Sequence, residues 1–217
     1  MEPIQILGVN VGHPTQIAKG VRSAIGKQRV ARGTTLQLSD VNLEGDAQAE
    51  RRVHGGPEKA VYAYPSEHLP VWSAELGQPL DDAAPFGENL STAGATEADV
   101  VVGERWAWGD AVLEVCQPRW PCHKLIIHRG SPDVADRMAD TGRSGWYLRV
   151  LEPGRVPVDG SIEVLERPKD APNILDCVLA RTDLHNGDPT RAERVIDAPA
   201  LSRQWRRYLQ AGLRSHG

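Results

Sequence analysis

The stretch DVVVGERWAWGDAVLEVCQ, residues 99–117, sets the expected architecture of the chain. Apolar and polar side chains alternate along much of it, as they do in strands that bury one face. Gly103-Glu104 and Gly109-Asp110 are typical of tight turns between neighbouring strands. The stretch therefore predicts a three-strand meander, with Trp106 and Trp108 on the same face of its middle strand.

Similar short runs, alternating in polarity or rich in β-branched residues, occur on both sides of this meander. They are IQILGVNVG (4–12), TTLQLSDV (34–41), KAVYAYP (59–65) and WYLRVLEPG (146–154). The chain also has 16 prolines and 21 glycines but 1 phenylalanine, which favours a turn-rich β architecture over a helical bundle. We therefore expect a mainly β domain over residues 1–167.

Helical periodicity interrupts the β pattern twice and then dominates the end of the chain. PSEHLPVWSAELG (65–77) offers Ser66 as a cap and Gly77 as a stop, and SPDVADRMADTG (131–142) offers Ser131 and Gly142. After ERPKDAPN (166–173), which reads as a linker, apolar stripes predict three short helices. We expect these to form a small C-terminal three-helix domain over residues 168–217, with Cys177 buried in it.

The composition excludes several classes of protein. The chain has 217 residues, a formal net charge of −4 and no run approaching the roughly 18 apolar residues of a membrane span. That charge argues against general nucleic-acid binding, which usually needs a strongly basic face. The N-terminus lacks the features of a signal peptide, and the 3 cysteines have no framework spacing, so we expect a cytoplasmic protein.

QPRWPCHKL, residues 117–125, holds the cysteine with the most reactive surroundings. Arg119, His123 and Lys124 lie within three positions of Cys122, and neighbouring cations lower the pKa of a cysteine. A thiolate is both a nucleophile and a soft metal ligand. The alternative is a buried cysteine that packs as a small apolar residue, and these nine residues leave both interpretations open.

Cys116 is different, because it ends the apolar run AVLEVC and has no cationic neighbour within two positions, so we expect it to be buried packing. Cys116, Cys122, His123 and His128 also give a C-x5-C-H-x4-H pattern. Structural zinc sites usually pair their cysteines in a C-x2-4-C knuckle, so this spacing argues against zinc.

LEGDAQAERRVHGGPEKAV, residues 43–61, combines Gly45-Asp46 and Gly55-Gly56 with basic side chains at Arg51, Arg52, His54 and Lys59. Glycine turns expose backbone N–H groups that can form anion-binding concavities. The stretch fits either a phosphate-type oxyanion or a polar hairpin loop. Asn89, in PFGENLST (85–92), would close a turn or present its amide to a heterocycle, and Arg149 must find an acidic partner or an anionic ligand.

Taken in order, four segments resemble the MOSC domain, the family named after the C-terminal domain of molybdenum-cofactor sulfurase. The bacterial YiiM-like branch, associated with resistance to 6-N-hydroxylaminopurine, is the most similar. The segments are VNVG (9–12), GDAQAERRVHGGPEKAVYAYPSEH (45–68), FGENL (86–90), and QPRWPCHKL with GWYLRVLEPG. The resemblance covers about residues 4–165 and implies a barrel-like β domain with one pocket, followed by three helices.

The resemblance also implies functional residues. Cys122 would be the essential cysteine and a ligand of molybdenum in a molybdopterin cofactor. His54, Gly55, Gly56 and Lys59 match the HGG-x-x-K element, Asn89 the ENL element, and Arg119 the PR-x-PC element. We expect His54 or His123 to deliver protons. The residues expected to hold the cofactor are Gly55, Gly56, Lys59, Asn89, Arg119, Lys124 and Arg149. His123 stands where the family pattern has an aromatic residue.

Three classes of function follow. The first is molybdenum-cofactor-dependent reduction of N-hydroxylated purines or amines, a detoxification that would need a separate electron-donor reductase. The second is sulfur transfer through a Cys122 persulfide. The third is a non-catalytic module that binds an anion, for which an exposed apolar face on the tail would be evidence. The partners expected are thus a small molecule and an electron donor, without nucleic acid or membrane, and a homodimer remains open.

Overall fold

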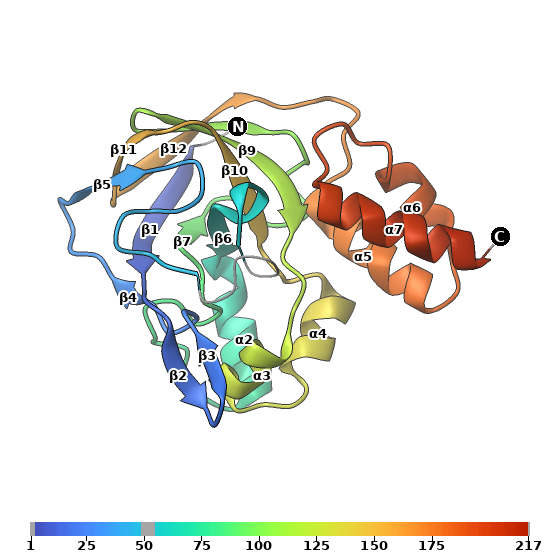
Figure 1. The fold of residues 1–217 in the computed structure, drawn as a ribbon, viewed down its shortest axis with the longest axis horizontal. Helices are drawn as coiled ribbons and strands as arrows, with labels where there is room; N and C mark the ends of the chain where they lie inside the picture. The colour runs from blue at the N-terminus through green and yellow to red at the C-terminus, as the bar shows by residue number, and fades with distance from the viewer. Residues whose placement is uncertain (1–2, 49–54, 217) are drawn as a thin grey trace.

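The computed structural model describes residues 3–48 and 55–216 as a β-barrel with short helices at one end and three C-terminal helices on one side (Figure 1). The strands are β1 (Ile4–Val11), β2 (Thr15–Ala18), β3 (Val21–Ser23), β4 (Gln28–Arg29), β5 (Thr35–Leu38), β6 (Val61–Pro65), β7 (Leu90–Ala93), β8 (Arg105–Trp108), β9 (Ala111–Pro118), β10 (Trp146–Glu152), β11 (Gly154–Pro157) and β12 (Gly160–Glu166). The helices are η1 (Pro57–Lys59), η2 (Ser66–His68), α2 (Leu69–Leu76), α3 (His123–Arg129), α4 (Val134–Thr141), α5 (Ile174–His185), α6 (Thr190–Val195) and α7 (Arg203–His216).

The barrel closes because β1 pairs with strands on both of its sides. Within the described residues its seven strands follow the order β12-β8-β9-β10-β6-β7-β1, and β1 pairs again with β12. Neighbours are antiparallel except β6 and β7, which run parallel with Ala63 opposite Leu90. The expectation of a mainly β, barrel-like fold followed by three helices is confirmed.

The predicted three-strand meander is wrong in its first strand. β8 and β9 pair as expected, with Trp106 opposite Leu113. Residues 100–102 do not pair with them, although Gly103 N donates to Val115 O of β9 (2.8 Å). Val102 N instead donates to Pro172 O (3.0 Å), and Ile174 N donates to Val100 O (2.9 Å). The segment before the meander is therefore bonded to the beginning of α5.

The predicted C-terminal ends of α2 and α4 are confirmed, whereas their predicted N-terminal caps are wrong. Gly77 and Gly142 end α2 and α4 in the left-handed conformation, as predicted. Ser66 and Ser131 do not cap them, because α2 begins after His68 and α4 begins after Asp133. The short helix α3, which begins directly after Cys122, was not predicted.

The apolar interior continues from the barrel into the C-terminal helices. Trp106 and Trp146 pack edge to face inside the barrel with ring centroids 5.9 Å apart. Cys177 is fully buried, as expected, and the same core includes Leu184 of α5 and Leu209 of α7. The apolar face of the tail is thus packed against the barrel rather than exposed. An exposed face would have favoured the non-catalytic binding module.

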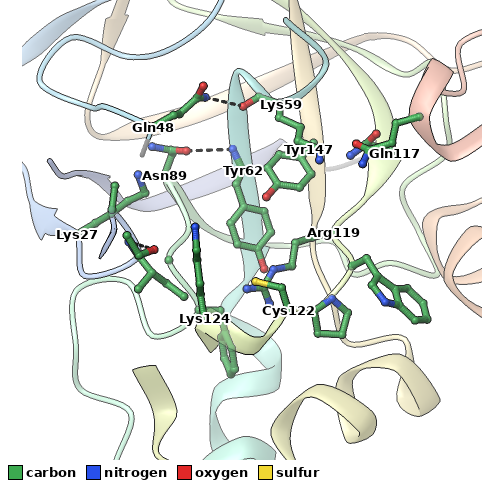
Figure 2. Close-up of a pocket in the computed structure, with 18 of the residues that line it drawn as sticks. Lys27, Gln48, Lys59, Tyr62, Asn89, Gln117, Arg119, Cys122, Lys124 and Tyr147 are labelled. Atoms are coloured by element: carbon green, nitrogen blue, oxygen red, sulfur yellow. Dashed lines mark hydrogen bonds between the residues drawn. The ribbon is translucent and has the colours of Figure 1, made fainter. Parts of the chain in front are cut away.

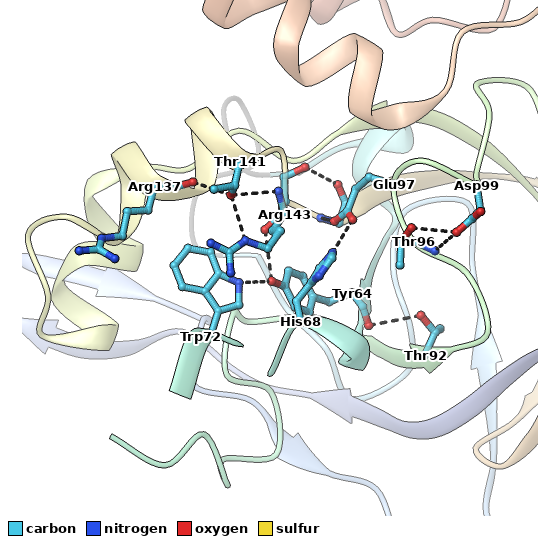
Figure 3. Close-up of polar contacts among 12 residues, drawn as sticks. Tyr64, His68, Trp72, Thr92, Thr96, Glu97, Asp99, Arg137, Thr141 and Arg143 are labelled. Atoms are coloured by element: carbon cyan, nitrogen blue, oxygen red, sulfur yellow. Dashed lines mark hydrogen bonds and ion pairs between the residues drawn. The ribbon is translucent and has the colours of Figure 1, made fainter. Parts of the chain in front are cut away.

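A polar cluster at the helical end of the barrel fixes the strand that leads into the cavity described below (Figure 3). Glu97, which is 3% exposed, contacts His68 Nε2 at 2.6 Å through one carboxylate oxygen. Its other oxygen accepts from Gly145 N at 2.6 Å. Gly145 O in turn accepts from Arg119 N (3.1 Å), so the cluster sets the position of the backbone at Arg119.

Glu88, in the turn before β7, is a buried carboxyl group. Its oxygens accept from Phe86 N (3.0 Å) and from the Ser91 hydroxyl (3.1 Å). Burial raises the pKa of Glu88 from 4.5 to about 7, and these hydrogen bonds oppose the rise only in part. Between about pH 4.5 and pH 7 the folded protein therefore keeps a proton on Glu88 that the unfolded chain has released.

Glu88 should make the protein less stable as the pH rises from about 4.5 to about 7, because the folded state holds the extra proton across that range. Glu88→Gln, which cannot ionise, should lack this contribution. Denaturant unfolding of both proteins between pH 4 and pH 8 should show the variant gaining up to about 3 kcal/mol relative to the wild type. Parallel pH curves would show that Glu88 titrates normally.

Candidate active site

A cavity of about 380 Å³ lies where the barrel loops face the C-terminal helices (Figure 2). Its volume suits a small organic ligand. The barrel and its loops contribute mostly polar side chains, and the tail contributes a further wall. The lining includes Lys27, Asp46, Gln48, Lys59, Tyr62, Asn89, Gln117, Arg119, Trp120, Cys122, Lys124 and Tyr147 from the first part, and Arg181, Gln204, Trp205 and Tyr208 from the tail.

Cys122 lines this cavity from the junction between the β9 loop and α3. Its backbone is extended, with φ −140° and ψ 166°, and its carbonyl accepts the first α3 hydrogen bond from Leu125 N (2.9 Å). The residue is partly exposed, whereas Cys116 and Cys177 are buried. Cys122 is therefore the cysteine that a cavity ligand can reach.

Cys116 is held in a different environment. Its sulfur lies within hydrogen-bonding distance of two carbonyl oxygens, Glu58 O (3.2 Å) and Tyr147 O (3.4 Å), and burial raises the pKa of its thiol to about 12. Burial raises the pKa of Cys177 as well. Both stay protonated at neutral pH and serve as packing.

Arg119 lies beside Cys122 and Lys59 lines the same cavity, so both cations add positive charge to the surroundings of Cys122 (Figure 2). Burial lowers the pKa of Lys59, while the anionic forms of Cys116, Cys122 and Glu58 oppose this. Burial also works against the charge of Arg119, but Tyr62, Tyr147 and Cys122 outweigh it and raise its pKa. Because such interactions are mutual, both cations favour the thiolate form of Cys122.

The neighbouring tyrosines are neutral hydrogen-bonding groups. Burial raises the pKa of Tyr62 and of Tyr147, and the Arg119 cation opposes both rises in part. The Arg119 guanidinium lies 5.5 Å from the Tyr62 ring centroid, and Lys59 Nζ lies 5.8 Å from that of Tyr147. The aromatic rings thus hold both cations in the wall of the cavity that Cys122 lines.

Asp46 organises the opposite side of the cavity. One of its carboxylate oxygens accepts from Gly12 N (2.9 Å) and from Lys27 Nζ (2.5 Å). The other accepts from Asn89 Nδ2 (3.0 Å). Lys27 is therefore neutralised within the protein.

Asn89 is also committed to the protein framework. Its Nδ2 donates a second time, to Asn10 O (3.2 Å), and its Oδ1 accepts from Tyr62 N (3.2 Å). Asn89 lines the cavity, but both of its N–H donors are used, and only a lone pair of Oδ1 remains for a ligand.

The structure brings together Cys122, Arg119, Lys124, Lys59 and Asn89 of the predicted site residues. It does not bring Arg149, Gly55 or Gly56 into the lining. His54 lies outside the described residues, as do Arg51 and Arg52.

Arg149 instead fastens the tail to the barrel. Its guanidinium donates to Ala200 O (2.8 Å) and pairs with Glu114 (3.3 Å) and Glu58 (3.5 Å). The arginine thus found the acidic partners that were one of its two expected alternatives, and its assignment to the cofactor is corrected. Gly56 likewise has a structural task, since it precedes η1 with φ 91° and its N–H donates to Gln48 Oε1 (3.2 Å).

The expectation that His123 delivers protons is wrong. It is the first residue of α3, its side chain is exposed, and it is not part of the cavity lining. Helix α3, which was not predicted from the sequence, places His123 outside the cavity lining and Lys124 within it.

Several lining residues were missed by sequence reasoning. Tyr147 had a signal, since it alternates with Trp146 in β10. Lys27 and Arg181 had none, because each reaches the cavity only through the folding of a distant segment. Among the described residues no group of three or more His, Cys, Asp or Glu side chains could hold a metal ion, so the C-x5-C-H-x4-H pattern is not assembled there.

The C-terminal wall is held in place by the start of α7. Ser202 N donates to Cys116 O (2.9 Å), and its hydroxyl donates to Gln117 Oε1. The Glu58 carboxylate accepts from Arg203 N (3.0 Å). The tail is therefore bonded to the strand that leads to Cys122.

The sequence pattern of the MOSC domain matches residues 50–163, which is more than half of the chain. The chain belongs to the MOSC domain family. It is 39% identical to protein YiiM of Escherichia coli (strain K12) over 194 residues, covering 88% of this chain and 85% of that protein. No helix in the described part of the chain is long and apolar enough to cross a membrane.

Two other relatives are similar to most of this chain. The crystal structure of YiiM from Geobacillus stearothermophilus superposes with a TM-score of 0.79 at 33% identity, covering 97% of this chain and 100% of that one. A protein of Gibberella moniliformis (strain M3125 / FGSC 7600) named "Reductase" is 37% identical over 172 residues, which are 77% of this chain and 30% of that protein.

Iodoacetamide at neutral pH should alkylate Cys122 in the folded protein at least about tenfold faster than Cys116 or Cys177, because Cys122 is partly exposed whereas the other two are buried. Mass spectrometry of peptides at successive times measures the three rates. Lys59→Met should shift the Cys122 rate profile to higher pH, whereas Lys169→Met, at an exposed position outside the lining, should not. Equal rates for the three cysteines, or no shift in Lys59→Met, would contradict the assigned electrostatics.

Proposed function

We propose that this protein is a molybdenum-cofactor-dependent reductase of N-hydroxylated purines and related amines, with Cys122 as the molybdenum ligand. The observation that carries the proposal is a partly exposed cysteine at the wall of a cation-lined cavity. Membership in the MOSC family and a relative named "Reductase" support it.

The residues present fit such a cofactor chemically. Molybdenum bound by sulfur takes a thiolate ligand, which Cys122 offers beside Lys59 and Arg119. The phosphate of the cofactor is an anion that cationic donors bind well. Asp46 is the one carboxylate among the described lining residues, and Lys27 already neutralises it.

The proposed reaction converts R–NH–OH, two electrons and two protons into R–NH₂ and water. When bound, the cofactor would supply the electron transfer that breaks the N–O bond, and a separate reductase protein would provide the electrons. The chain itself would position and protonate the substrate.

Lys59 is the described residue that best fits proton delivery. Burial lowers its pKa, which makes its ammonium a stronger acid than an exposed lysine, and it lies in the same wall as Cys122. Tyr147 and Tyr62, both neutral, would exclude water and orient the ligand. Arg119 would hold negative charge on the Cys122 side of the cavity.

Cys122→Ser should lose bound molybdenum and turnover while keeping the fold, because a hydroxyl is a poor ligand for a soft metal. The test is elemental analysis and reductase assay of protein made in a host that produces the cofactor. Cys116→Ser is the matched control, since Cys116 is buried outside the cavity lining and a hydroxyl there can donate to Glu58 O or Tyr147 O.

Full activity or full metal content in Cys122→Ser would refute the proposal. Wild-type protein without molybdenum, but with one extra sulfur atom on Cys122 by mass spectrometry, would instead select sulfur transfer through a persulfide.

A further inference from the structure

We infer that Arg181, in the C-terminal tail, binds an anionic oxygen group of the substrate, so that the preferred substrates are phosphorylated N-hydroxylated nucleosides rather than free bases. The inference rests on the function proposed above and assigns to the tail helices the choice of substrate.

Arg181 reaches the cavity from α5 and meets the loop that carries Cys122. Its guanidinium carbon lies 3.9 Å from the ring centroid of Trp120, which belongs to the same PRWPC stretch as Cys122. It lies 3.7 Å from the ring of Tyr208 and 5.5 Å from that of Trp205, both on α7. Aromatic rings at stacking distance hold the guanidinium by its faces.

Stacking leaves the edge of the guanidinium, which carries the N–H donors, as the part that a cavity ligand can contact. An arginine held in this way is suited to bind phosphate or carboxylate through two parallel hydrogen bonds. Its Nε is buried without a hydrogen-bond partner among the described residues, and a side-chain hydrogen bond joins the guanidinium to Tyr208. The remaining N–H groups of its terminal nitrogens are therefore the donors that a ligand could use.

Within residues 3–48 and 55–216, no acidic side chain balances the charge of Arg181. Burial lowers its pKa, and the hydroxyl of Tyr208 opposes this. Lys59, another cation of the lining, is close enough for Arg181 to lower its pKa. Partly buried cations that repel one another favour binding of an anion, because the anion offsets both the cost of burying their charges and the repulsion between them.

A purely structural role would explain the stacking but not the position. Cation–π contacts could join α5, α7 and the Trp120 loop at any point of their interface, yet Arg181 is part of the cavity lining. It shares that lining with Cys122, so a ligand whose reactive nitrogen approaches Cys122 can extend its anionic substituent toward the tail.

The test is equilibrium binding of 6-N-hydroxyadenosine and its 5′-monophosphate, measured by calorimetry without an electron donor. The wild type should bind the monophosphate at least about tenfold more tightly, as expected for a charge-assisted hydrogen-bonded pair. Arg181→Met should remove this preference while keeping nucleoside affinity and bound molybdenum. Arg181→Lys should retain part of the preference, and Arg207→Met, at an exposed position on α7 outside the lining, should retain all of it.

Equal affinity of the wild type for the two ligands, or an unchanged preference in Arg181→Met, would overturn the inference. Loss of molybdenum in Arg181→Met would also overturn it, because Arg181 would then serve the cofactor. If Arg181→Met does not fold, Arg181→Lys replaces it in the test. An undiminished preference of the folded Arg181→Lys protein for the monophosphate over the nucleoside would also overturn the inference. Failure of the proposed function would show separately, as wild-type protein without molybdenum.

Discussion

The carboxylate of Asp46 joins three distant segments of the chain at the edge of the cavity. It accepts hydrogen bonds from Gly12 at the end of β1, from Lys27 before β4 and from Asn89 before β7. Because these groups are buried, loss of the carboxylate would leave Lys27 as an uncompensated buried charge. The shape of the barrel mouth therefore depends on this one side chain.

The opposite wall depends on contacts that connect the barrel to its tail. Glu97 fixes Gly145, and Gly145 fixes the backbone of Arg119. Ser202, at the start of α7, is bonded to Gln117 and to the carbonyl of Cys116. The strand that ends in the Cys122 loop is thus restrained from both sides, and a ligand would meet a preorganised cation cluster rather than mobile side chains.

The sequence predicted features that arise from local interactions. The alternation of apolar and polar side chains predicted most barrel strands. Gly77 and Gly142 predicted helix ends, because glycine adopts the left-handed conformation without a steric cost. Cys122 was found because its cations lie beside it in the chain. Features that depend on tertiary contacts were missed or misplaced.

Arg149 shows why the remainder could not be predicted. An arginine among apolar neighbours needs a negative partner, but only the fold shows that this partner is Glu114 and Glu58 rather than a ligand. Residues 100–102 were predicted to form a strand of the meander, yet their backbone is bonded to residues 172–174, more than 60 positions away. Arg181 was invisible for the same reason, since the cavity contains it only after α5 and α7 have packed on the barrel.

X-ray absorption at the molybdenum edge would show whether Cys122 provides a sulfur ligand to molybdenum. The comparison is between the wild-type protein loaded with the cofactor and the same cofactor free in solution. We expect one more sulfur neighbour of molybdenum in the protein than in the free cofactor. An identical sulfur shell in the two samples would contradict the assignment of Cys122.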